Sequence, residues 1–271
     1  MRKIIVSVAP VSLNVADTVK SALTPAEIAS DVIKSANCGA SMVHLHVRDE
    51  MGNLTDNMTN FSKTLDLIKE KSDIIVQGST GGISDLTLDQ RCVSITDKRV
   101  EVASLNMGSA NLEDDVYVNT LPDIRYWLKR MNEERVKPEL EVFEAGMVNN
   151  VFLMNQENLL NKLYNFAFCL GFKGAMPASA YNLHFLKEMV PAGSTWGFIH
   201  HGMMDMSLLA TAIGMGATMI RVGFEDSVYY AEDKMAKSNQ ELVGQAVSLI
   251  RSIGYEVATP AEARKILNIT D

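Results

Sequence analysis

Cysteine is scarce in this 271-residue chain, and its three copies, Cys38, Cys92 and Cys169, lie far apart with no Cys-x-x-Cys spacing. Such a set fits a reducing compartment and three small core residues better than disulfides or a thiolate metal site. Proline is also rare, with 7 residues against 17 glycines, while 47% of the residues are hydrophobic. This composition excludes a disordered chain and predicts a globular protein with a sizeable core.

Long apolar runs and clusters of positive charge are missing as well. No run approaches the roughly 18 residues that a membrane-spanning helix needs, and the N-terminus turns polar too early for a signal peptide. The 25 basic and 33 acidic residues give a net charge of −8, and no stretch gathers lysine and arginine into a patch. We therefore expect a cytoplasmic protein that binds neither membranes nor nucleic acid.

Short β-branched runs alternate with amphipathic segments along the whole chain. Residues 24–39 read as a helix with Thr24 as N-cap, Pro25 at the first helical position and Gly39 at the end. We predict eight strands: Lys3–Ala9, Ser41–Arg48, Asp73–Gly78, Glu101–Met107, Glu139–Phe143, Tyr164–Leu170, Thr195–His200 and Thr218–Phe224. Eight strands separated by helices, in a chain near the ~250 residues typical of the architecture, favour one (β/α)8 TIM barrel over residues 1–271 rather than a doubly wound open sheet.

The sharpest local signal is the histidine pair in the second predicted strand. His44 and His46 are two residues apart and therefore point to the same face, while Leu45 and Val47 would face the helices. A divalent metal would take one lone pair from each imidazole. The alternative is two histidines that are hydrogen-bonded separately at the barrel mouth.

A third metal ligand is available where the last predicted strand ends. Period-2 alternation puts Arg221, Gly223 and Glu225 on one face, with Glu225 pointing inward. Two histidines and one carboxylate leave an open position on a zinc ion, as expected of a catalytic site. The alternative for Glu225 and Asp226 is an acidic cap on a following helix.

The segment 139–147 carries three carboxylates at and beyond a strand, where a barrel keeps the polar groups of its site. We take Glu141 as the site candidate, Glu139 as a solvated strand start and Glu144 as a helix cap.

Other strand ends carry weaker polar signals. The glycines in 77–82 would let backbone N–H groups approach an anionic ligand, although such a pair is most often a turn. Ser104 and Asn106 stand on alternating positions, which also fits ordinary hydrogen bonding at a strand end. His200 and His201 are adjacent, so at most one of them faces inward.

Five motifs, taken in order, resemble the β-keto acid cleavage enzyme family over the length of the chain. They are Val43-His44-Leu45-His46-Val47-Arg48, Ser79-Thr80-Gly81-Gly82, Ser104-Leu105-Asn106, the segment 139–147 and the segment 221–226. The resemblance implies a zinc-dependent (β/α)8 barrel, often a homotetramer, that reacts a β-keto acid with acetyl-CoA to give acetoacetate and a new acyl-CoA. A zinc-assisted aldol cleavage without CoA is the alternative activity, and a non-catalytic metal-binding barrel is a third possibility.

The same resemblance implies roles for individual residues. The zinc ligands of the family match His44, His46 and Glu225. Its substrate-binding positions match Ser79, Gly82 and Ser104. Residues implicated in catalysis match Glu141, Arg221 and Asp226.

One departure from the family bears on the substrate. In the member that acts on 3-keto-5-aminohexanoate, an acid on the first βα loop holds the substrate amine, but residues 10–14 carry no acid. An ammonium group without a partner there would lose hydration that nothing replaces. We therefore expect neutral or aliphatic β-keto acids to be preferred, with Met203 and Met204 as candidates to line the pocket.

Overall fold

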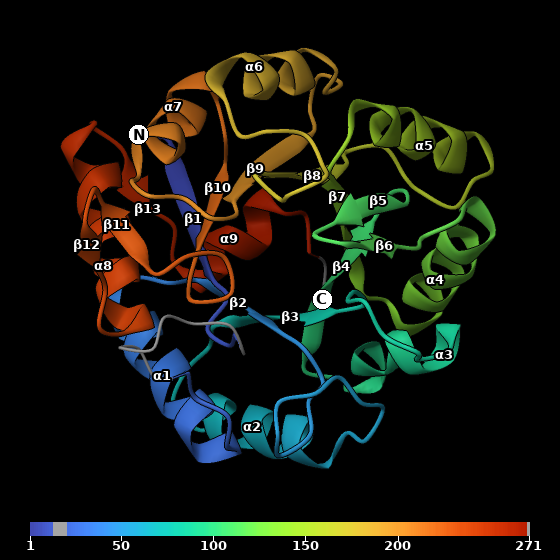
Figure 1. The fold of residues 1–271 in the computed structure, drawn as a ribbon, viewed down its shortest axis with the longest axis horizontal. Helices are drawn as coiled ribbons and strands as arrows, with labels where there is room; N and C mark the ends of the chain where they lie inside the picture. The colour runs from blue at the N-terminus through green and yellow to red at the C-terminus, as the bar shows by residue number, and fades with distance from the viewer. Residues whose placement is uncertain (13–20, 270–271) are drawn as a thin grey trace.

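Short, buried runs rich in β-branched residues form a closed parallel barrel in the computed structural model, which describes residues 1–12 and 21–269. Within these residues the barrel strands are β1 (Lys3–Val8), β2 (Met42–Leu45), β3 (Ile75–Ser79), β4 (Val100–Asn106), β7 (Lys137–Val142), β8 (Asn165–Leu170), β9 (Thr195–His200) and β10 (Met219–Val222). Each strand pairs with the next in this order, and β10 pairs with β1 to close the circle (Figure 1). The predicted (β/α)8 TIM barrel is confirmed.

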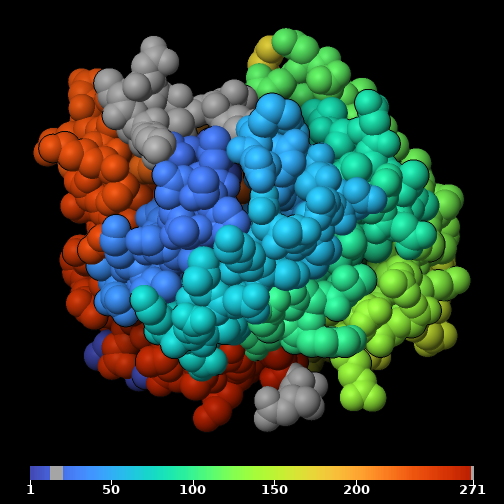
Figure 2. All heavy atoms as spheres, turned by 90° about the horizontal axis from the view of Figure 1, so that it is seen from below, coloured from blue at the N-terminus to red at the C-terminus, as the bar shows by residue number. Residues whose placement is uncertain are grey.

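Helices follow the strands and cover the barrel. In the described part of the chain they are α1 (Pro25–Cys38), α2 (Thr59–Lys69), α3 (Leu88–Arg91), α4 (Leu121–Glu134), α5 (Ala145–Gln156), α6 (Ala180–Glu188), α7 (Ser207–Met215), α8 (Asn239–Ser252) and α9 (Pro260–Ile266), with a 3-10 turn η1 (Val93–Thr96). α1 begins as predicted, because the Thr24 hydroxyl accepts the N–H of Glu27 and the Glu27 carboxylate accepts the N–H of Thr24. It packs against α2 on one side and α8 on the other, and Figure 2 shows its blue surface beside the cyan segments.

Five short strands were not predicted from the sequence. Hairpins β5 (Ala110–Leu112) with β6 (Asp115–Tyr117) and β11 (Tyr229–Ala231) with β12 (Lys234–Met235) follow β4 and β10, and β13 (Glu256–Val257) pairs with β1. Strands of two or three residues span about one alternation, so a period-2 pattern does not mark them. Among the helices described above, none is both long enough and apolar enough to span a membrane.

The second strand is shorter than predicted, and this places a candidate ligand on a loop. β2 ends at Leu45, and the chain then folds back through an antiparallel bridge between Arg48 and Leu54. His46 therefore lies just beyond the carboxyl end of the strand. Active sites of TIM barrels are built at this end.

Candidate active site

The chain turns sharply as it leaves β10. The strand ends at Val222, earlier than the predicted Phe224, because Gly223 has a φ of 142°. A side chain at Gly223 would begin 2.2 Å from the carbonyl oxygen of Ala9, so only glycine fits. Beyond this turn the N–H of Glu225 donates to the same oxygen at 3.1 Å. The turn thereby holds Glu225 at the barrel mouth.

His44, His46 and Glu225 converge there. The two Nε2 atoms lie 3.3 Å apart, and Glu225 Oε1 lies 3.5 Å from His44 Nε2 and 3.6 Å from His46 Nε2. Within residues 1–12 and 21–269 they form the one group of three potential metal ligands. In a tetrahedral zinc site with Zn–N distances of about 2.0–2.1 Å, ligand atoms lie roughly 3.3–3.4 Å apart. The triangle has the size that zinc requires.

The protonation states also fit a cation. Burial lowers the pKa of His44 to about 3, although Glu225 opposes this shift, so the imidazole is neutral and offers a lone pair. Burial opposes ionisation of Glu225, but its pKa still lies below the ordinary value, because His46 hydrogen-bonds to it and the positive charge of Arg221 is close. Two imidazoles and a carboxylate are a common donor set for catalytic zinc. The alternative in which Glu225 caps a helix is wrong, since hairpin β11–β12 follows it.

Arg221 connects the candidate metal ligands to two further acids. Its guanidinium, in a side chain only 5% exposed, binds Asp226 in a bidentate manner, with Nε to Oδ2 at 2.8 Å and Nη2 to Oδ1 at 2.6 Å. Nη2 also lies 3.4 Å from Glu225 Oε1, and Nη1 lies 3.9 Å from Glu141 Oε1. A planar guanidinium in this position fixes the orientation of the Asp226 carboxylate.

Burial perturbs both of these acids in the same direction. It raises the pKa of Glu141 to about 8 against the attraction of Arg221, so this side chain is largely protonated at neutral pH. It also raises the pKa of Asp226, with a contribution from the negative charge of Glu225, while Arg221 opposes the shift. Acids with raised pKa values beside a cleft are candidates for proton transfer.

The predicted substrate-binding residues lie on the neighbouring strands. Ser79 ends β3, stands beside Ser104 of β4 in the register and lines a small cavity together with His46. The Ser79 hydroxyl accepts the N–H of Gly81 at 3.0 Å. Gly82 has a φ of 125°, in the left-handed region that favours glycine, and a side chain there would collide with Leu54.

One prediction for the segment 139–147 is wrong. Glu139 is not solvated, because its side chain points into the barrel and is 0% exposed. Glu144 stands at the predicted helix cap, as the N-cap residue of α5, although among the described residues its side chain accepts no capping hydrogen bond. Sequence reasoning also missed Gln77, which contacts His44 inside the barrel. Its position in the row of inward-facing residues, two before Ser79, is the signal that could have identified it.

The adjacent histidines at the end of β9, its last residue His200 and the following His201, stand outside the group of candidate metal ligands. His201 stacks on Phe172 with ring centroids 4.1 Å apart, and burial lowers the pKa of His200.

Comparison with known proteins establishes the family. The sequence model of the beta-keto acid cleavage enzyme family matches residues 3–269. The chain belongs to the β-keto acid cleavage enzymes. It is 40% identical to the 3-keto-5-aminohexanoate cleavage enzyme of Fusobacterium nucleatum over 91% of this chain and 90% of that protein. It is 31% identical to the 3-oxoadipate:acetyl-CoA acetyltransferase of Cupriavidus necator, over 91% of this chain and 87% of that protein.

A solved structure shares the fold of this family member. The ternary complex of ObcA with a C4-CoA adduct and oxalate superposes with a TM-score of 0.76 at 20% identity, over 91% of this chain and 67% of that one. Sequence similarity at this level supports the barrel architecture alone.

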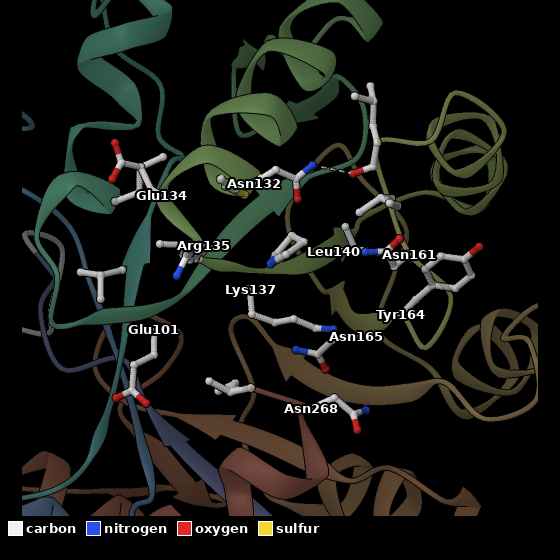
Figure 3. Close-up of a pocket in the computed structure, with 18 of the residues that line it drawn as sticks. Glu101, Asn132, Glu134, Arg135, Lys137, Leu140, Asn161, Tyr164, Asn165 and Asn268 are labelled. Carbon is white, nitrogen blue, oxygen red and sulfur yellow. Dashed lines mark hydrogen bonds between the residues drawn. The ribbon is translucent and has the colours of Figure 1, made fainter. Parts of the chain in front are cut away.

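A sizeable cavity of this β-keto acid cleavage enzyme lies away from the candidate metal ligands. It has a volume of about 600 Å³ and opens among the residues where β4, β7 and β8 begin, including Lys137 and Asn165 (Figure 3). Its acids already have cationic partners, since Glu101 binds Arg264 and Glu134 binds Lys98. The site is therefore assigned to the opposite end of the barrel, by its chemistry rather than by volume.

The buried Glu139 predicts a pH-dependent stability. Burial raises its pKa from 4.5 to about 7, so the folded chain keeps a proton that the unfolded chain releases. The associated stability is complete below the unfolded pKa of 4.5 and is lost as the pH rises towards 7. We expect the free energy of unfolding of the wild type to fall, relative to that of Glu139→Gln, by about 3 kcal/mol across this interval.

Urea unfolding of both proteins at about pH 5 and about pH 7.5 measures this difference. The matched control is Glu232→Gln, a change at an exposed glutamate of hairpin β11–β12. Equal pH slopes for the wild type and Glu139→Gln would show that Glu139 is ionised in the fold.

Proposed function

We propose that this chain is a zinc-dependent enzyme that condenses a β-keto acid with acetyl-CoA and releases acetoacetate and a new acyl-CoA. The carrying observation is the zinc-sized triangle of His44, His46 and Glu225 next to the buried pair of Arg221 and Asp226. Membership of the family and relatives named for acetyl-CoA transfer support the reaction class. Zinc bound by the three ligands would supply a Lewis acid that stabilises negative charge on a carbonyl oxygen.

Asp226 is the proposed base. It accepts a proton from the carbon between the keto and carboxylate groups of the substrate. Arg221 binds both carboxylate oxygens of Asp226 and so holds this carboxylate in one orientation. Its positive charge also stabilises the changes in charge at the site that accompany the proton transfer. Glu141, largely protonated at neutral pH, offers a hydrogen-bond donor on the other side of the guanidinium. The β-keto acid substrate is positioned by Ser79, Gly82 and Ser104.

The remaining steps need no reactant other than the β-keto acid and acetyl-CoA. The carbanion of the β-keto acid attacks the carbonyl carbon of acetyl-CoA, and CoA leaves as its thiolate. The thiolate then attacks the original keto carbon, and the bond between this carbon and the α-carbon breaks. The acyl group departs as acyl-CoA, and the α-carbon takes up one proton to give acetoacetate. The protein's contribution is the removal and return of that proton and the orientation of both substrates.

The deciding experiment incubates purified protein with acetyl-CoA and a panel of β-keto acids and measures acetoacetate. Formation that depends on both substrates is the expected result. Carbon–carbon cleavage without CoA would favour the aldol alternative, and metal binding without turnover of any keto acid would favour a binding barrel. We also propose a homotetramer in solution, in the cytoplasm, from the family resemblance, and light scattering of the purified protein tests the tetramer.

Within this function we expect a preference for neutral or aliphatic β-keto acids over 3-keto-5-aminohexanoate. On the first βα loop Val11 is buried, and Leu13, Asn14 and Asp17 lie outside the described residues. Asp205, a further candidate to hold an amine, is exposed, and its carboxylate accepts the N–H of Ser207 at 2.7 Å. A substrate ammonium would need a carboxylate to replace its hydration.

A competition assay with equal concentrations of one neutral and one aminated acid measures the ratio of kcat/KM. Two relatives, 40% and 37% identical, carry the name of the aminated substrate, so this pair is a stringent test. Faster consumption of the aminated acid would contradict the expected preference and would direct attention to Asp17 and Asp205. Variants of each acid to asparagine would then show which one holds the amine.

A further inference from the structure

A buried amide contacts one of the candidate metal ligands from the neighbouring strand. His44 of β2 and Gln77 of β3 are register partners, and both side chains are buried inside the barrel. His44 Nδ1 lies 2.8 Å from Gln77 Oε1. This is a normal hydrogen-bond distance. The Gln77 amide therefore holds the ring of His44 at Nδ1, and Nε2 of the same ring points towards His46 and Glu225.

The chemistry of the ligand decides which group of the amide must face the ring. His44 Nε2 lies at the donor triangle, so it must carry a lone pair to bind a metal. The single proton of the neutral imidazole is then on Nδ1, and this N–H needs an acceptor. Gln77 meets that need with its oxygen, but the same amide rotated by half a turn would present a donor and favour the wrong tautomer.

Glu139 supplies the reason why the amide does not rotate. It lies on the same inward face, fully buried, and the Gln77 amide is close enough to lower its pKa against the effect of burial. In the described part of the chain, Gln77 Nε2 and both carboxyl oxygens of Glu139 have no partner within hydrogen-bond distance. An amide donor and a carboxyl acceptor that both lack a partner in one buried space form a hydrogen bond when the two side chains move slightly closer. A carboxyl group keeps an acceptor oxygen in both of its protonation states.

We propose that Gln77 and Glu139 are positioning residues for the metal: Glu139 accepts from the Gln77 amide, and the Gln77 oxygen accepts from His44 Nδ1–H and so fixes the tautomer that binds zinc. The inference rests on the proposed metal site. Partners of this kind orient a ligand, and their loss typically weakens metal binding by about 10–100-fold.

The first test replaces Gln77 with methionine, which has a similar volume and no acceptor oxygen. The dissociation constant for Zn²⁺ is measured by competition with a chelator, without any substrate, and we expect it to rise by about 10–100-fold. The absorption spectrum of the Co²⁺-loaded protein should change as well. Asn165→Leu is the matched control, because Asn165 is a buried amide of β8 that binds Thr195 instead of a metal ligand. It should leave zinc affinity unchanged.

The second test exchanges the two groups, Gln77→Glu with Glu139→Gln. In the double variant a carboxyl oxygen faces His44 Nδ1–H, and an amide donor remains on the other side. We expect zinc affinity within a few-fold of the wild type. Gln77→Glu alone places two carboxyl groups in one buried space and should bind zinc less tightly than the double variant.

The outcomes separate this inference from the proposed function. Equal zinc affinity of the wild type and a folded Gln77→Met variant overturns the positioning role alone. Failure of the exchange to restore affinity, with circular dichroism like that of the wild type, also overturns it. A wild-type protein that binds no zinc overturns both proposals. If the zinc affinities of the variants differ as expected but the wild type cleaves no β-keto acid, the positioning role of Gln77 and Glu139 is supported and the enzymatic function is overturned.

Discussion

His46→Ala is expected to remove metal and turnover together. His46 Nε2 is one vertex of the donor triangle, 3.3 Å from His44 Nε2 and 3.6 Å from Glu225 Oε1. Without it two protein ligands remain, which is fewer than the three that a catalytic zinc site uses. We expect metal content to fall from about one ion per chain to near zero, and acetoacetate formation to fall to background. Metal analysis of the purified variant and the substrate assay are the measurements.

His184→Ala is the control for this variant. His184 is an exposed histidine of α6 near Glu188, so its loss should change neither metal content nor rate. Full activity of a metal-free preparation, from either the wild type or His46→Ala, would refute a metal-dependent reaction.

Asp226→Asn separates proton transfer from metal binding. Asparagine keeps the size of the side chain and one acceptor oxygen for Arg221, but it cannot take up the substrate proton. The metal ligands are unchanged, so metal content should persist while kcat falls by about 10²–10⁴-fold, the usual contribution of a general base. Metal analysis and steady-state kinetics on one preparation test both parts. A smaller loss of kcat would point to another base.

Glu225→Gln is the natural comparison, because this acid is the neighbour of Asp226 in the chain. It weakens a metal ligand, so metal and rate should decrease in parallel. If Asp226→Asn instead lost its metal and Glu225→Gln kept it, the roles of the two acids would have to be exchanged.

The convergence of His44, His46 and Glu225 was predictable because it depends on alternation along strands. His44 and His46 share a face by their spacing of two, and Glu225 follows Arg221 by four in a strand-like segment. The structure places all three at one end of the barrel, although His46 and Glu225 lie just past the strands. A shortened strand leaves the prediction intact as long as the loop keeps the side chain at the mouth.

The inward position of Gln77 follows from alternation with Ser79, but the burial of Glu139 and the contact between Gln77 and His44 were not predictable from local sequence. Glu139 opens a charged segment after Lys137 and Pro138, which is typical of a solvated strand start, and its burial depends on the barrel closing around it. The contact between Gln77 and His44 depends on the register of two strands about thirty residues apart. No single-strand pattern records which residues stand side by side in a neighbouring strand.

The turn at Gly223 has a consequence for mutational scanning. Every substitution there should abolish activity, because any Cβ would meet the Ala9 backbone. A scan scored only by growth or turnover would therefore rank Gly223 with the ligands and the base, although it has no side chain to perform chemistry. Supplying excess zinc would separate the weakened ligand variants, which recover part of their activity, from the others. Variants of the base and of Gly223 do not recover, and for Gly223 the reason is the clash with the Ala9 backbone.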